Sequence, residues 1–351
     1  MQEIILGDCL EVVKTFPDNH FSAVVTDPPY GLNFMDKKWD HGIPGTEIWA
    51  ECLRVCKPGG FLLAFGGTRT YHSLTCAIED AGWEIRDCLM WIYGSGFPKS
   101  HNHFGIEGYG TCLKPAYEPI IMAMKPCDGT FKQNAEKWGQ AGININACRI
   151  ATDQNLGRTT SSNTLYEGGW KKIERPNPEG GRWPANILFD EEATKSLDEQ
   201  SGVLTSGSGR KRSFNSHSLY EHGLKSSDQQ FQGSSGGASR FFYCAKASSR
   251  ERNEGLQALP YQIRGALNAT VHGDSRTGKK TIQKNNHPTV KPLKLMEYLI
   301  KLISPPKDVL ILDPFAGSGT TLLACKNLGI SGIGIEKEKE YAEIARKRIE
   351  N

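Results

Sequence analysis

The chain has 351 residues, of which 38% are hydrophobic and 23% are charged, and its formal net charge is +3. This composition is typical of a globular protein with a full core, in one large domain or two smaller ones. No apolar run approaches the roughly 18 residues of a membrane span, and Met1-Gln2-Glu3 lacks the basic residues of a signal peptide, so we expect a cytoplasmic protein without membrane contact.

The first predicted element is a short apolar strand from residue 4 that ends in Asp8. A helix that includes Val12 and Val13 and ends near Phe16 follows it. Asp8 can be the N-cap of this helix, or it can contact a ligand at the carboxyl end of the strand.

The next strand is predicted at Ala23-Val24-Val25-Thr26 and runs into Asp27-Pro28-Pro29-Tyr30. The strand must end there because neither proline can donate a ladder hydrogen bond. Asp27 and the carbonyl of Pro28 are both acceptors, so together they can take the two protons of an exocyclic amino group, while Tyr30 stacks on the ring. The alternative is a proline-rich turn after a core strand. In the following loop, Lys37 and Lys38 suit phosphate contacts or form a solvated charge pair.

Alternating helices and strands come next. The patterns predict helices over 48–55 and 71–81 and strands over 61–67, 83–93 and 117–124, the last pairing antiparallel with its predecessor. This alternation is typical of an α/β sheet. The ten cysteines along the chain show no zinc-ligand spacing, which indicates reduced thiols and no metal site.

The pattern degrades from about residue 126 to 286, where Ser, Gly, Asn and charged residues dominate. Residues 205–284 carry 13 Lys/Arg and 5 Asp/Glu, a balance of +8 that leaves −5 on the rest of the chain. A basic segment beside an acidic core indicates a face that meets a polyanion. A disordered insertion is the alternative, but Trp138, Trp170 and Trp183 are unusual in a solvated segment.

The last segment begins with His287-Pro288-Thr289-Val290-Lys291-Pro292-Leu293, before a helix predicted over 294–303. An apolar strand then runs into Asp313-Pro314-Phe315-Ala316-Gly317-Ser318-Gly319, and a helix follows over 322–328. The glycines let the backbone approach a ligand at the N-terminus of that helix. A further strand ends in Glu336, 23 residues after Asp313, where an acid can bind ribose hydroxyls. These features predict a site for an adenosine derivative.

The two loops, Asp27–Tyr30 and Asp313–Gly319, resemble motifs IV and I of the S-adenosylmethionine-dependent DNA amino-methyltransferases, and their order resembles the β class. The resemblance covers residues 1 to about 126 and 285 to 351. It implies a doubly wound, mostly parallel, seven-stranded α/β sheet in permuted order with an antiparallel hairpin. The implied parts are a catalytic part at 1–126, an inserted target recognition region at 127–285, and a cofactor-binding part of the same methyltransferase domain at 286–351.

The resemblance also implies the site. The catalytic residues would be Asp27, Pro28, Pro29 and Tyr30. S-adenosylmethionine would be bound by Asp8, Asp27, Lys291, Asp313, Phe315, Ala316, Gly317, Ser318, Gly319 and Glu336. Within this set Asp8 would face the adenine of the cofactor, and Lys291 would meet its carboxylate.

The implied activity is methyl transfer to a base flipped out of double-stranded DNA. Asp at the first position of the Asp27–Tyr30 loop favours adenine N6 over cytosine N4. Cytosine N4, an RNA or protein methyltransferase, and a DNA-binding protein without catalysis are the alternatives. The resemblance leaves a homodimer and a cognate restriction nuclease open as partners.

Overall fold

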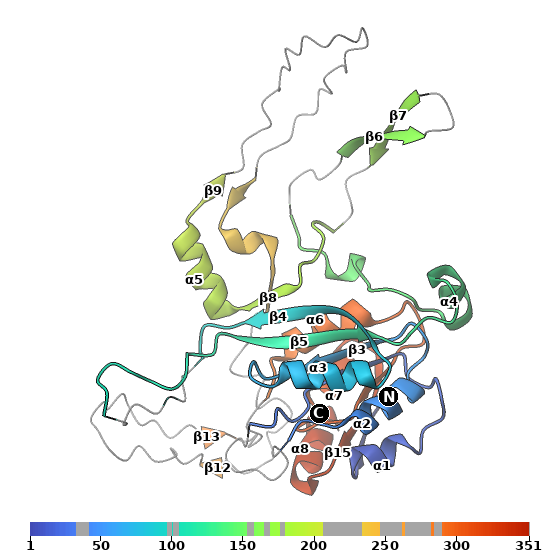
Figure 1. Cartoon of the computed structure of the whole chain (residues 1–351), viewed down its shortest axis with the longest axis vertical. Helices are drawn as coiled ribbons and strands as arrows, with labels where there is room; N and C mark the ends of the chain where they lie inside the picture. Colours follow the sequence, from blue (N-terminus) through green and yellow to red (C-terminus); the bar gives the residue numbers. More distant parts are fainter. Residues whose placement is uncertain are drawn as a thin grey trace.

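A central nine-stranded sheet organises the computed structural model, which describes residues 1–32, 42–96, 100, 105–152, 158–164, 169–175, 180–205, 234–245, 262–263, 282–283 and 290–350 (Figure 1). In spatial order its strands are β1 (Gln2–Leu6), β15 (Ser331–Glu336), β14 (Leu310–Asp313), β2 (Ala23–Thr26), β3 (Phe61–Phe65), β5 (Tyr117–Met124), β4 (Glu84–Ile92), β8 (Ile187–Asp190) and β11 (Tyr243–Ala245).

The directions of the strands determine which residues lie together at one edge of the sheet. The strands β1, β15, β14, β2 and β3 are parallel, β5 runs antiparallel between β3 and β4, and β4 pairs in parallel with β8. The first residues of β5 therefore lie at the same edge as the last residues of the parallel strands. The strands β14 and β15, from the end of the chain, are inserted between β1 and β2, which confirms the permuted order predicted from the sequence.

The sheet is two strands wider than predicted. Strand β8 pairs with residues 90–92 of β4, and β11 pairs with β8, both in parallel. Both strands come from the segment 127–285 that the resemblance assigned to target recognition. The pairing of β8 with β4, and of β11 with β8, depends on long-range contacts that a local sequence pattern does not carry.

Helices cover both faces of the sheet. On one face lie α1 (Cys9–Val13), α2 (Thr46–Val55) and α3 (Tyr71–Asp80), and on the other α6 (Leu293–Ile303), α7 (Thr320–Asn327) and α8 (Lys339–Glu350). Side chains of β3 alternate between them: Leu62 and Ala64 pack with α1–α3, whereas Leu63 and Phe65 pack with α6 and α7. A strand that is buried on both faces needs apolar residues at every position, as β3 has.

The other described helices and strands lie outside the nine-stranded sheet and the six helices that cover it. They are α4 (Phe131–Trp138), η3 (Asn146–Cys148), β6 (Arg158–Thr164), β7 (Gly169–Arg175), α5 (Glu191–Ser201), β9 (Leu204–Thr205), β10 (Ser235–Gly236), η4 (Ala238–Phe241), β12 (Gln262–Ile263) and β13 (Ile282–Gln283). The predicted phosphate-contacting Lys37 and Lys38, and most of the basic segment 205–284, lie outside the described residues. Within the described ranges, no helix is long and apolar enough to cross a membrane.

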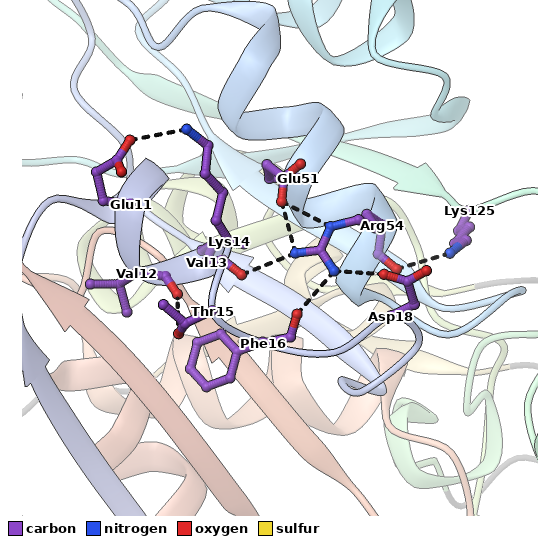
Figure 2. Close-up of polar contacts among 10 residues, drawn as sticks. All are labelled: Glu11, Val12, Val13, Lys14, Thr15, Phe16, Asp18, Glu51, Arg54 and Lys125. Carbon is purple, nitrogen blue, oxygen red and sulfur yellow. Dashed lines mark hydrogen bonds and ion pairs between the residues drawn. The ribbon is translucent and has the colours of Figure 1, made fainter.

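Arg54, in the last turn of α2, holds the connection between α1 and β2 (Figure 2). Its guanidinium donates to the carbonyls of Val13 at 3.2 Å and Phe16 at 2.9 Å, and pairs with Asp18 at 2.6 Å and with Glu51 at 2.8 Å. The two carbonyls belong to the end of α1 and the turn that follows it, and the Val13 carbonyl also accepts from the Phe16 N–H at 3.1 Å. One side chain thus fixes the turn that leads into β2.

Candidate active site

A cavity of about 620 Å³ lies along the edge where the parallel strands end. Its wall includes residues from the loops after β1, β2, β14 and β15, from the start of β5 and from the segment before α6. Among the predicted site residues, the cavity is lined by Asp8, Asp27, Pro28, Pro29, Tyr30, Lys291, Asp313, Phe315, Ala316, Gly317, Ser318 and Glu336. The fold therefore brings together residues from both ends of the chain.

The loop after β2 is held at its far end. Thr70, at the start of α3, donates its hydroxyl to the carbonyl of Tyr30 at 2.7 Å. The Tyr30 hydroxyl lies 2.8 Å from Asp27 Oδ1 and 3.1 Å from Glu118 Oε2. Burial and the two neighbouring carboxylates raise the pKa of Tyr30 well above its ordinary value, so the hydroxyl keeps its proton as a donor.

Lys291 joins three segments of the chain at one ammonium group. Its Nζ lies 2.9 Å from Asp27 Oδ2, 2.9 Å from Glu118 Oε2 and 3.0 Å from the Tyr30 hydroxyl. Burial opposes its charge, but Asp27 and Glu118 outweigh that cost and raise the pKa of Lys291. Because an ammonium has three donors, these three contacts use all of them. The contact between Lys291 and the cofactor carboxylate stays a prediction, and in this geometry the ammonium faces two protein carboxylates.

Asp27 is a half-buried acceptor. Its side chain is 20% exposed and its two oxygens face Tyr30 and Lys291. Burial raises its pKa, the Lys291 charge opposes that rise, and the Glu118 charge adds to it. Each carboxylate oxygen has two lone pairs, so Asp27 can still accept from a further donor in the cavity.

Asp313 organises the turn after β14. Its Oδ1 accepts from the Thr26 hydroxyl at 2.6 Å and from the Phe315 N–H at 3.1 Å, and its Oδ2 accepts from the Thr321 hydroxyl at 2.5 Å. Burial raises its pKa to about 6 despite these donors. The Asp313 carboxylate therefore connects the start of its own loop to the end of β2 and to the first turn of α7.

Glu336, at the end of β15, binds the backbone of the Asp313–Gly319 loop. Its Oε2 accepts from the Gly317 N–H at 2.8 Å, and its Oε1 accepts from the Glu338 N–H at 2.7 Å. Burial raises its pKa to about 7. A carboxylate anchored by two backbone donors, in the wall of the cavity, keeps lone pairs for hydroxyl groups of a ligand.

The two loop glycines differ in what they do. Gly317 has a φ of +52° and lines the cavity. Gly319 has a φ of +76°, and a Cβ there would lie 2.8 Å from Cβ of Ala345 in α8. Close packing of α8, rather than approach of a ligand, thus explains Gly319. Buried Arg348 of the same helix donates to the Ser318 carbonyl at 2.6 Å, so α8 supports the loop from beneath.

Asp8 is the N-cap that the sequence offered as one alternative, and its contact with a ligand stays a prediction. It caps α1 by accepting from the Leu10 N–H at 3.1 Å, and it lines the cavity. Lys337 lies 3.2 Å from its Oδ2. Burial works to raise the pKa of Asp8, but the hydrogen bond from Lys337 and the Leu10 N–H hold it below its ordinary value.

Several residues of the wall were not predicted from the sequence. Among them are Tyr93, Tyr117 and Glu118, which lie where the β4–β5 hairpin meets the cavity. Glu118 carried a usable signal, because an acid at the start of a buried antiparallel strand lies at the edge where its parallel neighbours end.

Comparisons with known proteins match this geometry. The family model described as DNA methylase matches residues 21–347. The type II methyltransferase M.HpaI of Haemophilus parainfluenzae is 42% identical over 358 residues, which cover 100% of this chain and 74% of that protein. The type II methyltransferase M2.DpnII of Streptococcus pneumoniae is 56% identical over 64 residues, 18% of this chain and 24% of that protein.

A solved structure supports the fold. The structure described as PvuII DNA methyltransferase (cytosine-N4-specific) has a TM-score of 0.51 and 15% identity, and the match covers 99% of this chain and 86% of that chain. A likeness at this identity concerns the fold alone.

Proposed function

The chain belongs to the DNA methylase family of S-adenosylmethionine-dependent enzymes, and from that premise we propose that it methylates the N6 amino group of adenine in duplex DNA. One observation carries the proposal: Asp27 and Tyr30 share a single cavity with Asp8 and Glu336. The groups suited to an amino-bearing base and those suited to an adenosine therefore face one space.

The cofactor half of the cavity fits S-adenosylmethionine. Glu336 presents a carboxylate that suits ribose hydroxyls, as in other nucleotide sites at the end of a second parallel strand. Asp8 provides an acceptor for an adenine amino group, and Phe315 an aromatic face. We propose that these residues, with Ala316, Gly317 and Ser318, hold the cofactor. When bound there, S-adenosylmethionine supplies an activated methyl group.

The base half uses the loop after β2. The nitrogen of an adenine amino group is a poor nucleophile because its lone pair is delocalised into the ring. Hydrogen bonds from its two N–H groups to Asp27 and the Pro28 carbonyl favour a pyramidal nitrogen, an interaction that is stronger in the transition state than in the ground state. Pro29 restricts the loop and Tyr30 offers a face for stacking.

The base must leave the DNA helix to reach this cavity. Unstacking and unpairing cost about a few kcal/mol, and stacking against an aromatic side chain offsets part of that cost. Tyr93 and Tyr117 line the cavity near Tyr30 and would enclose the base further.

Adenine is favoured over cytosine by Asp27, the first residue of the loop. The description of the PvuII structure names cytosine N4, but its 15% identity to this chain carries no argument about the base. A homodimer and a cognate nuclease remain predictions from the resemblance, and a cytoplasmic location remains a prediction from the amino-acid sequence.

The test is incubation of the protein with unmethylated duplex DNA, amplified in vitro, and methyl-labelled S-adenosylmethionine. Digestion to nucleosides and mass spectrometry should show labelled N6-methyladenine. Labelled N4-methylcytosine would overturn the choice of base, and no labelled nucleoside would overturn the proposed activity on DNA.

The matched variant is Asp27→Asn, which keeps the shape of the side chain and removes its charge. Loss of a preorganised transition-state contact of this kind costs about 10²- to 10³-fold in rate. We expect that loss in methyl transfer, with cofactor affinity measured by calorimetry changed little. Unchanged turnover would remove Asp27 from the mechanism.

A further inference from the structure

The site contains a second carboxylate that the proposed mechanism does not use. Glu118, at the start of β5, shares the Lys291 ammonium with Asp27, at 2.9 Å from each carboxylate. Its Oε2 also lies 3.1 Å from the Tyr30 hydroxyl. The Glu118 side chain is 22% exposed and the Lys291 side chain 8%, so solvent screens the contact only in part.

The charges in this cluster do not balance. Two carboxylates face one ammonium, and the Tyr30 hydroxyl is neutral. Asp27 alone with Lys291 would form a closed ion pair, which lowers the basicity of a carboxylate. With Glu118 present, the Lys291 ammonium is divided between two carboxylates. Asp27 is then stabilised less by the positive charge and stays a stronger hydrogen-bond acceptor.

Glu118 also limits the orientations that the Lys291 and Tyr30 side chains can adopt. It accepts a hydrogen bond from Lys291 and lies within hydrogen-bond distance of Tyr30, and both of these side chains contact Asp27. An ammonium on a four-carbon stem has many rotamers, so a second anchor limits where its remaining donors point. Asp27 is therefore oriented by two groups that Glu118 holds.

We propose that Glu118 is a positioning residue for methyl transfer, which acts through Lys291 and Tyr30 to orient Asp27 and to keep it basic. The inference rests on the proposed function, since it concerns the carboxylate that accepts the amino protons of the base. Glu118 makes no contact with the reacting atoms in this account.

Other charged or titratable groups surround the cluster. Asp313, at the end of β14, interacts electrostatically with Asp27, and Tyr93, after β4, interacts with Glu118 and Lys291. Lys337, in the loop after β15, lines the same cavity but pairs with Asp8. The substitutions below leave all three of these groups in place.

The test is the pH dependence of methyl transfer in a single turnover, because product release then does not mask the chemical step. Asp27 must be ionised to accept protons, so its ionisation sets the acid limb of the profile. Glu118→Gln removes a negative charge that raises the pKa of Asp27. We expect the acid limb to move to lower pH by about one unit and the plateau rate to fall about tenfold.

Lys291→Met provides the opposite measurement. It removes the cation that opposes the rise in the pKa of Asp27, so the acid limb should move to higher pH by about one unit or more. Glu118→Asp keeps the charge and should restore an acid limb near that of the wild type. A merely structural role for Glu118 would lower activity without moving the limb in opposite directions in the two variants.

The matched control is Glu84→Gln. Glu84 pairs with Met124 at the far end of the same β4–β5 hairpin, and its side chain is 48% exposed. Its profile should coincide with that of the wild type. Cofactor affinity and melting temperature are measured for every variant and identify any variant that fails to fold. If Glu118→Gln does not fold, the direction of the acid-limb shift in Lys291→Met tests the proposal instead.

The outcomes separate the two proposals. A wild-type protein that labels no nucleoside at any pH overturns both the proposed function and this inference. An active wild type whose acid limb stays in place or moves upward in Glu118→Gln, or stays in place in Lys291→Met, overturns only the inference.

Discussion

Thr26 donates its hydroxyl to Oδ1 of Asp313 at 2.6 Å, across 287 positions of the chain. Thr26 is the last residue of β2 and Asp313 the last of β14, so this buried hydrogen bond joins the strand that leads to the catalytic loop with the strand that leads to the cofactor loop. This single hydrogen bond therefore helps to fix the distance between the Asp27–Tyr30 loop and the Asp313–Gly319 loop.

Thr26→Val should destabilise the protein. The substitution keeps the β-branched shape but removes the donor, and a buried carboxylate that loses a hydrogen bond costs about 1–3 kcal/mol. Thr26→Ser keeps the hydroxyl and should cost about 1 kcal/mol through the lost methyl group. Urea unfolding of both variants measures the difference; equal losses would show that the hydroxyl contributes nothing.

Tyr30 variants should separate stacking from hydrogen bonding. Tyr30→Ala removes the ring and should weaken catalysis most, since base–aromatic stacking amounts to about 1–3 kcal/mol. Tyr30→Phe and Tyr30→Trp keep a stacking face but lose the hydroxyl near Asp27 and Glu118, so each should show a loss of about 1 kcal/mol or several-fold in rate. Single-turnover rates check the order, and equal losses in all three would remove stacking from the account.

Gly319→Ala should be far more harmful than Gly329→Ala. Both glycines have positive φ, +76° and +68°, so each substitution carries a backbone strain of about 1–2 kcal/mol. Only at Gly319 does a Cβ meet another element, at 2.8 Å from Ala345, whereas nothing lies within 4 Å at Gly329. Overpacking adds about 1–3 kcal/mol. The prediction fails if urea unfolding gives the same free energy for both variants.

Glu336 should make stability fall as pH rises. Burial raises its pKa from 4.5 to about 7, so between these values the folded protein binds more protons than the unfolded chain. The free energy of unfolding must then decrease across that window, by about 1–2 kcal/mol for a partly exposed group. Glu336→Gln should remove this decrease.

The control for this measurement is Glu343→Gln, on the exposed side of α8. Melting curves of the cofactor-free protein at pH 4.5 and 7.5 should show the wild type and Glu343→Gln losing stability together. A Glu336→Gln curve parallel to theirs would contradict the prediction.

Local sequence patterns were enough to predict most strands and helices around the site and the position of both loops. Prolines at 28 and 29 end β2, and the Asp313–Gly319 turn precedes α7, because those effects act within a few residues of the backbone. The order of the two loops was also enough to predict the permuted sheet, since each strand's place follows from the βαβ unit to which it belongs.

The grouping of Asp27 and Glu118 around the Lys291 ammonium depends on long-range contacts of the folded chain. Glu118 and Lys291 lie 88 and 261 positions from Tyr30, and the pairing of β5 between β3 and β4 is what brings Glu118 to the site. The protein carboxylates that pair with Lys291 could not be identified along the chain. The roles of Gly319 in packing α8, and of β8 and β11 in widening the sheet, likewise depend on long-range contacts that no local pattern encodes.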